Sequence, residues 1–202
     1  TDMASSASPY GLQPISDQSG TPRTQVIKNG IASGLASNIF KFQPVMLDTT
    51  NGTITPCTAT TDKILGVFAG VEYTPTGQRP VVSPFWPASS TYTAGQGDMN
   101  VYIWPAWIPG LRFLIQADGT VPQADFGAQF NFVAGALASG STVTGLSACS
   151  ANHTSIAASS QGQLVLLEFF EGVSNALGDA FTDLIVGIAY PQIVGGFQTS
   201  AG

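Results

Sequence analysis

The sequence predicts an all-β fold, either an antiparallel β-barrel or a β-sandwich, with an extended N-terminal arm and long loops. Eight to ten short apolar or alternating runs recur along the chain, each bounded by turn-forming residues. Almost no stretch carries the apolar spacing of an amphipathic helix. Short strands at regular turn spacing are typical of barrels and sandwiches. We therefore expect an arm over residues 1–24 and a single β domain over residues 25–202.

The arm is rich in Ser, Pro, Gln and Gly, and its scattered apolar residues include Tyr10, Leu12 and Ile15. A segment of this composition does not bury enough apolar surface to form a core of its own. Two interpretations fit: a free tail, or an extended arm that orders on a neighbouring subunit. In the second interpretation Tyr10, Leu12 and Ile15 are the anchors.

The first strands follow the arm. Gln25 to Lys28 is predicted as one strand, and Ile39 to Leu47 as another that contains Pro44. Because proline has no N–H to donate to a sheet ladder, this second strand is expected at a sheet edge or with a bulge. A turn cluster over Asp48 to Gly52 leads to a third strand, Thr53 to Thr58.

The stretch from Asp62 to Gln78 is predicted to contain a buried central strand. Gly66 and Gly70 would each weaken a helix by about 1 kcal/mol, whereas glycine in a strand marks a bulge or the close approach of another backbone. Pro75 and Gly77 end the run with turn chemistry. Its apolar residues are Ile64, Leu65, Val67, Phe68 and Val71.

A long loop is predicted over residues 79–97, and loops of this length usually have a function. Next, Asp98 to Trp104 alternates as a strand, with Met99, Val101 and Ile103 on one face. The remaining strands are predicted over Arg112 to Ala117 (closed by the Asp118-Gly119 turn), Gln163 to Glu171 and Asp183 to Val194. Between the last two, Ser174 to Phe181 is predicted to form a short helical turn.

The composition favours a protein that works in an assembly. Charged residues make up 9% of the chain, against roughly 25% in typical soluble domains. Such a surface resembles protein interfaces, whose cores are depleted of Lys and Glu. The net charge is −6 and the six basic residues are spread singly, so direct nucleic-acid binding, which needs clustered Lys and Arg, is not expected. No segment approaches the roughly 20 apolar residues of a membrane span.

Catalysis is not expected, and no cofactor or metal is predicted. The one histidine, His153, is read as an exposed loop residue, and Gly-x-Ser-x-Gly is absent. Glu168 and Glu171 would point to opposite faces of a strand. Asp179 and Asp183 lie near a loop, and only a cleft that brought Glu168, Asp179 or Asp183 face to face would favour an enzyme.

The two cysteines, Cys57 and Cys149, either pair or stay free, and we expect free buried thiols in a chain made in a reducing cytoplasm. The chain begins Thr1-Asp2-Met3 with neither the basic nor the apolar region of a secretory signal peptide, so no such peptide is visible, and earlier removal of one stays open.

Three tryptophans, Trp86, Trp104 and Trp107, lie in rigid, proline-containing segments. Exposed tryptophan on such loops stacks on sugar rings, which would indicate a glycan-binding module. Tryptophan is also a favoured anchor at protein–protein interfaces. A third interpretation is that these side chains cap the end of the protein's own core.

Four motifs occur in a fixed order over the first 120 residues: Tyr10 to Ile15, Pro44 to Leu47, Ile64 to Tyr73 and Phe113 to Gly119. In this order they resemble the capsid decoration, or cement, proteins of tailed bacteriophages. The chain departs from the family at Gln13, where a basic residue is commoner, and in its second half.

The resemblance implies a structural virion protein that binds the outer surface of the phage head at capsomer junctions and stabilises the shell. Its partner would be the major capsid protein, and the chain is expected to be a homo-oligomer, a trimer or a dimer. An acidic protein suits the outer surface, because an inner lining would face packaged DNA. The alternatives are another β-rich virion protein, such as a coat subunit or a head or fibre component, and a glycan-binding β module.

Overall fold

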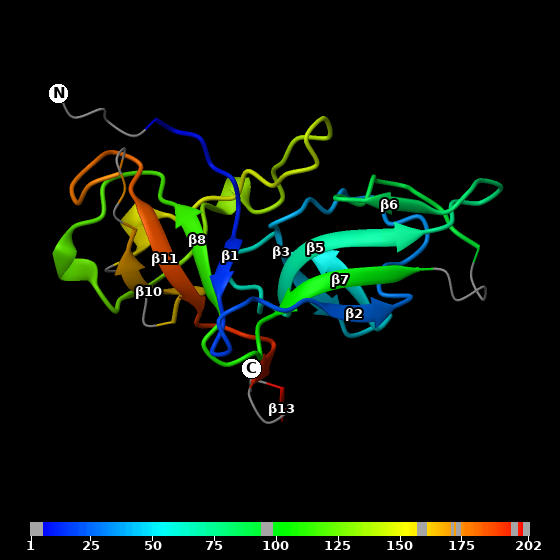
Figure 1. Cartoon of the computed structure of the whole chain (residues 1–202), viewed down its shortest axis with the longest axis horizontal. Coiled ribbons are helices and arrows are strands. Elements are labelled where there is room, and N and C mark those ends of the chain that lie inside the picture. Colours follow the sequence, from blue (N-terminus) through cyan, green and yellow to red (C-terminus); the bar gives the residue numbers. More distant parts are fainter. Residues whose placement is uncertain are drawn as a thin grey trace.

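A computed structural model of the chain describes residues 6–93, 99–156, 161–170, 172, 175–194 and 198–199. The strands form two antiparallel sheets and one short hairpin (Figure 1). The first sheet runs in the order β1 (Gln13–Ser16), β8 (Arg112–Gln116), β11 (Asp183–Ile188), β10 (Leu164–Phe169) and β9 (Gln129–Phe130). The second runs β2 (Gln25–Lys28), β7 (Asn100–Pro105), β5 (Gly66–Tyr73), β3 (Pro44–Asp48) and β4 (Thr53–Pro56), with β6 (Val81–Ser83) also on β5. The hairpin pairs β12 (Ile193–Val194) with β13 (Gln198–Thr199).

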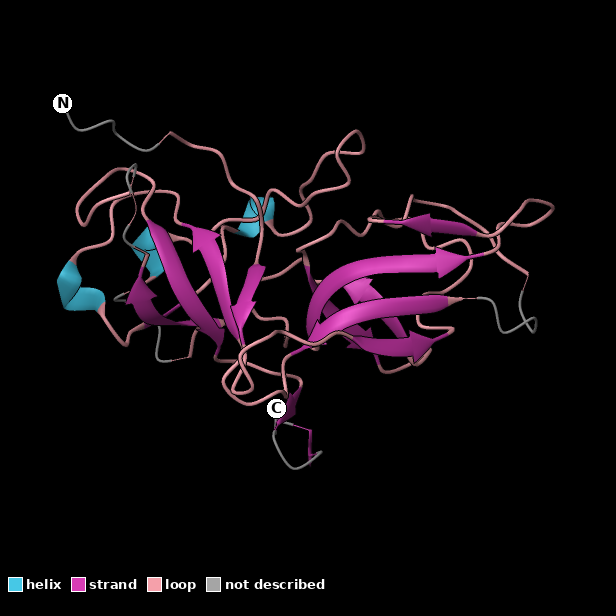
Figure 2. Ribbon diagram, in the orientation of Figure 1, coloured by secondary structure: helices cyan, strands magenta, loops and turns pink. Residues whose placement is uncertain are grey.

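The two sheets pack together as in a β-sandwich, and within the described ranges neither closes into a barrel. The all-β prediction is therefore confirmed, and the sandwich is the architecture found. Figure 2 shows the sheets as two groups of strands joined by long loops. Among the residues described, the helical elements are three short 3-10 turns, η1 (Gln123–Asp125), η2 (Ala134–Ala136) and η3 (His153–Ser155).

Strand β5 supplies side chains to both hydrophobic cores. Val67 belongs to the core beneath the first sheet, together with Phe113, Leu164 and Leu184. Phe68 belongs to the core of the second sheet. Because neighbouring strand residues point to opposite faces, one strand joins the two cores.

The predictions for the central strand and for β7 are confirmed. A Cβ at Gly66 would lie 2.5 Å from the carbonyl oxygen of Trp104, so only glycine lets β5 and β7 approach so closely. The pairing of β5 with β7 shifts register between Phe68 and Gly70, which is the predicted bulge. In β7, Val101 and Ile103 are buried while alternate residues are partly exposed.

The strand predicted over Ile39 to Leu47 is wrong in its extent and place. Ile39 and Lys41 make only isolated bridges, and the regular strand β3 begins at Pro44. Phe42 turns the chain with φ of 69°. Neither expected arrangement is found, because β3 lies between β5 and β4 and pairs with both without a register shift. Pro44 is accommodated as the first residue of the strand, a position where proline is tolerated.

The C-terminal predictions are corrected in two places. The strand predicted over Asp183 to Val194 is interrupted after Ile188, because the backbone N–H groups of Ala189 and Tyr190 both donate to the carbonyl of Gln163. In the segment Ser174 to Phe181, the described residues 175–181 form no helix. The Asn175 side chain holds this loop instead: it donates to the carbonyl of Phe170 and accepts from the N–H of Asp183.

The described part of the arm, residues 6–24, lies on its own chain. Gln13–Ser16 is the edge strand β1, paired with β8. The backbone N–H of Ser8 donates to the Gln116 side chain at 2.7 Å. These contacts place the arm beside the first sheet, where Figure 1 shows β1 next to β8.

Candidate functional site

The outer face of the first sheet carries an apolar strip between charged residues, and the side chains of this strip are partly exposed. Inward side chains of β8, β10 and β11 are fully buried: Phe113, Ile115, Leu164, Leu166, Leu184 and Val186. The alternate, outward positions of the same strands hold the partly exposed Leu114, Val165, Leu167 and Ile185 and, towards the strand ends, the charged Arg112, Glu168 and Asp183. Antiparallel sheets with one solvated face normally carry polar residues there. Such a patch indicates an interaction surface.

Two hollows lie on this outer face. One has a volume of about 510 Å³ and is lined by Trp107, Ile108, Arg112, Leu167 and Gly187, among others. Gly187 lies at the floor of this hollow between two apolar side chains, because a Cβ at this position would lie 3.3 Å from atoms of Val165 and of Leu167.

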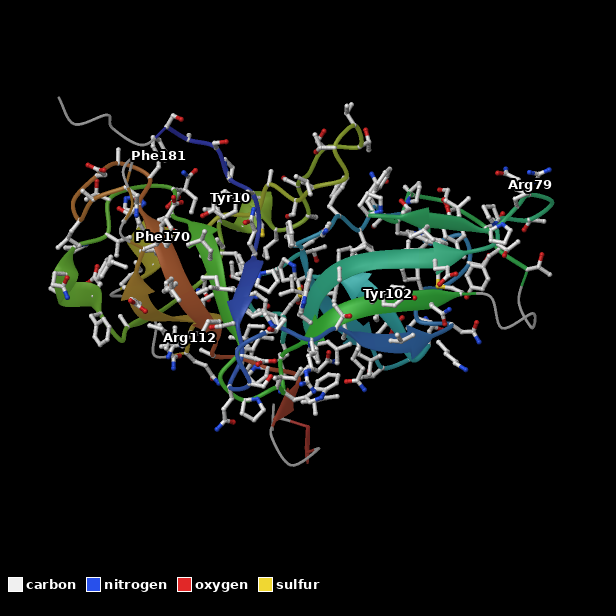
Figure 3. The ribbon with its side chains drawn as sticks, viewed as in Figure 1. Tyr10, Arg79, Tyr102, Arg112, Phe170 and Phe181 are labelled. Atoms are coloured by element: carbon white, nitrogen blue, oxygen red, sulfur yellow. The ribbon has the colours of Figure 1, made fainter. Side chains whose placement is uncertain are left out.

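The second hollow has a volume of about 590 Å³ and lies beside Glu168 and Ile185. Three exposed large apolar side chains border it: Phe126, Phe170 and Leu177, with 59%, 40% and 48% of their surface exposed. Figure 3 shows Phe170 and Arg112 towards opposite ends of the sheet.

One ion pair crosses the face between the hollows. The guanidinium of Arg112 on β8 lies 3.7 Å from the carboxylate of Glu168 on β10, and half or more of each side chain is exposed. Arg112 lines the first hollow and Glu168 the second. An exposed pair of this kind contributes little to stability, so both charges remain available to a partner.

The N-terminal arm covers one end of the same face. The Tyr10 hydroxyl donates to the outward carboxylate of Asp183 at 2.9 Å. Burial, with the nearby Asp183 charge, raises the pKa of Tyr10 far above its ordinary value. Burial also raises the pKa of Asp183, although its hydrogen bonds with Tyr10 and Gln116 act in the opposite direction. The carboxylate of Asp183 is therefore engaged within the chain.

The six residues predicted to bind a partner do not form one site. Leu12 and Trp86 are fully buried in this chain's own cores. Tyr10 is held by Asp183. Ile15 is 41% exposed at the sheet edge. Of the two remaining residues, Trp107 lines the first hollow, whereas Trp104 lies on the second sheet.

The burial of Trp86 favours the core interpretation for this tryptophan. Its ring packs against Tyr73, with 4.8 Å between ring centroids. A sugar ring therefore has no access to it in this structure.

A smaller groove lies on the second sheet. Its volume is about 380 Å³, and Tyr102, Trp104, Lys41 and Val82 are among its lining residues. Tyr102 and Trp104 are two residues apart on β7 and so share a face. The Tyr102 hydroxyl donates to Glu72 at 3.1 Å, and the Trp104 ring stacks on Phe42 with a centroid distance of 5.7 Å. An aromatic pair beside a carboxylate is suited to stacking and hydrogen bonding with a sugar.

His153 is not the exposed loop residue that the sequence predicted. Its Nδ1 lies 2.7 Å from an oxygen of Asp118, and about a third of each side chain is exposed. The same oxygen accepts the backbone N–H of His153. A carboxylate thus orients the imidazole, as a catalytic triad requires. Within the described ranges, however, no hydroxyl hydrogen-bonds the ring, so the pair does not define a nucleophile.

The two cysteines are free and buried, as predicted. Burial raises the pKa of the Cys149 thiol to about 11, against smaller opposing hydrogen bonds, and raises that of Cys57 further. Asp179 caps its own loop by accepting the N–H of Ala176, and Glu171 lies outside the described residues. Among the residues that the structure describes, no His, Cys, Asp or Glu cluster is arranged to hold a metal ion. No helix in the described chain is both long and apolar enough to cross a membrane.

Comparison of the chain with protein-family models, with curated proteins and with solved structures found no match.

Sequence reasoning missed the outer face of the first sheet. A signal for it was present, because β10 begins Leu-Val-Leu-Leu before Glu168 and β11 continues after Asp183 as Leu-Ile-Val, so each strand contains an apolar run without polar alternation. Continuous apolar strands are typical of sheets covered on both faces.

Proposed function

We propose that this chain is a structural virion protein, a capsid decoration or cement protein of a tailed bacteriophage. It binds the major capsid protein on the outer surface of the head at capsomer junctions and stabilises the shell. The observation that carries the proposal is the apolar strip on the outer face of the first sheet, on a chain with only 9% charged residues. Both features are typical of a protein that works in contact with partners. The resemblance of the four ordered motifs to decoration proteins is the reason for proposing a phage head as the assembly.

The mechanism is stabilisation by mass action. A protein that binds only the assembled shell shifts the equilibrium towards that shell. Many copies with modest interfaces act together when each unit has several contacts, because linked contacts raise the effective concentration. The net charge of −6 suits the outside of the head, away from packaged DNA.

Copy number and position in purified particles test the proposal. Quantitative mass spectrometry and cryo-electron microscopy are expected to find hundreds of copies on the outer lattice, at junctions between subunits. Shells that lack the protein are expected to lose their integrity at lower temperature. A handful of copies at a vertex or in the tail would favour another virion component. Absence from the particle would overturn both assignments.

A glycan-binding module is the second candidate, and the groove with Tyr102 and Trp104 favours it. Binding on a glycan array is then expected, with loss of that binding in Trp104→Ala. Trp107→Ala, which changes the other sheet's hollow, is the matched control and is expected to retain it. If no glycan binds, or both variants bind as the unchanged protein does, this candidate is rejected.

A further inference from the structure

We propose that the outer face of the first sheet binds the same face of a second copy of this chain. In this two-fold contact Arg112 of each copy pairs with Glu168 of the other. The proposal names the surface through which the protein self-associates, and it does not depend on which assembly the protein serves.

The first support is that the chain leaves apolar side chains of this face in contact with solvent. Tyr10 and the backbone near Ser8 lie over Asp183 and Gln116 at one end of the face. Leu114, Val165, Leu167 and Ile185 remain partly exposed over the rest. Burying such apolar surface against a partner is favourable, because it removes that surface from water.

The second support is charge complementarity between two copies. The molecule as a whole carries −6, which opposes random contact between copies. The open part of the outer face is different, since Arg112 and Glu168 there balance each other. A contact with two-fold symmetry is self-complementary. A two-fold axis that lies in the contact plane and passes between Arg112 and Glu168 places each positive charge against a negative charge of the other copy.

The geometry of the ion pair within one copy allows Arg112 and Glu168 to pair with the opposite charges of a second copy instead. The separation of 3.7 Å is long for a hydrogen-bonded pair, and the side chains are 50% and 59% exposed. Charged pairs across an interface fix register and suppress wrong orientations. The two pairs of a symmetric dimer would therefore select one alignment of the sheets.

The size of the surface is adequate only if the borders of the second hollow take part. The three long strands β8, β10 and β11 lie about 4.8 Å apart and are about 17–20 Å long, so they give a flat area on the order of 270 Å². A stable interface buries about 800 Å² per partner. The exposed side chains of Phe126, Phe170 and Leu177 extend the apolar surface beyond the strands. We expect these three to lie inside the contact.

A charge-reversal pair tests the proposal in solution. Sedimentation velocity at low salt is expected to show concentration-dependent dimers for the unchanged protein. Arg112→Glu alone and Glu168→Arg alone are each expected to be monomeric, since each homodimer then opposes like charges. An equimolar mixture of the two variants is expected to recover dimers. In that mixture both cross-pairs are again of opposite sign.

The mixture separates contacts between copies from effects within one copy. Each variant has lost its internal ion pair, and mixing does not restore it. Lys28→Glu, an exposed change on the edge strand β2, is the matched control and is expected to dimerise normally. Circular dichroism and urea midpoints check that every variant is folded.

Three outcomes overturn the proposal. The unchanged protein stays monomeric up to high concentration, or the mixture stays monomeric, or either variant alone dimerises like the unchanged protein. If the monomer binds shells and both variants lose that binding, the face belongs to the capsid protein instead of a second copy. Particle copy number is measured separately, so failure of this contact and failure of the proposed function are distinguishable.

Discussion

Gly66 lies where β5 and β7 approach most closely. A Cβ at this position would meet backbone atoms of Trp104 and Pro105, at 2.5 Å and 3.0 Å for the nearest atom of each. Backbone atoms in a central strand cannot move aside as a flexible side chain can. The residue is therefore needed for its lack of a side chain and not for its flexibility.

Gly66→Ala is expected to lower the free energy of unfolding by about 1–3 kcal/mol, the usual cost of overpacking. Urea denaturation measures it. Gly135→Ala is the matched control, because a Cβ at Gly135 meets no heavy atom within 4 Å. Equal midpoints for the two variants would contradict the close approach seen in the structure.

The cysteine thiols are shielded by the first core. Both side chains are fully buried, and burial raises the pKa of each, to about 11 for Cys149. Since the thiolate is the reactive species, neither cysteine is expected to react with a thiol reagent at pH 8 in the native protein. Both are expected to react after unfolding in urea. Rapid labelling of either one in the native state would show that this core is open.

At the scale of elements, the N-terminal arm behaves as part of the sheet. Leu12 is fully buried, whereas Ile15, three residues later, is 41% exposed. Leu12→Ala is expected to cost about 2–5 kcal/mol of unfolding free energy, the range for buried leucines. Ile15→Ala is expected to cost much less, which makes it a control within the same strand region. If the two variants unfold at the same urea concentration, the arm is not docked in solution.

Local patterns predicted some elements well. The alternation that ends at Trp104, the two glycines of β5 and the limits of β2 all follow from neighbouring residues, and the structure confirms them. The edge position of β1 depends on a partner far along the chain, and the inner position of β3 depends on which strands pair on its two sides. The sequence of one segment does not indicate which strands it will pair with. The ion pair of the outer face could not be predicted for the same reason. Arg112 on β8 and Glu168 on β10 come within 3.7 Å of each other because β11 pairs with both strands.

At the scale of the whole molecule, the two cores share β5, with Val67 in one and Phe68 in the other. We expect one cooperative unfolding transition, as for a single domain. Fluorescence of a variant that keeps only Trp86 reports the second core, and labelling of Cys57 and Cys149 reports the first. The two midpoints are expected to coincide. Separate midpoints would show that residues 25–202 contain two independent units.

The order of strands in the first sheet also sets when the molecule can be completed during synthesis. Strand β11 lies in the middle of that sheet, yet it is synthesised after all the other strands of the sheet. The hydrogen bond from Tyr10 to Asp183 can form only after the intervening chain has been made, because the two residues are 173 positions apart. Such long-range pairing is slow and leaves apolar strands open to aggregation. A premature stop before Asp183 therefore removes the centre of the sheet and leaves β8 and β10 without the strand that joins them.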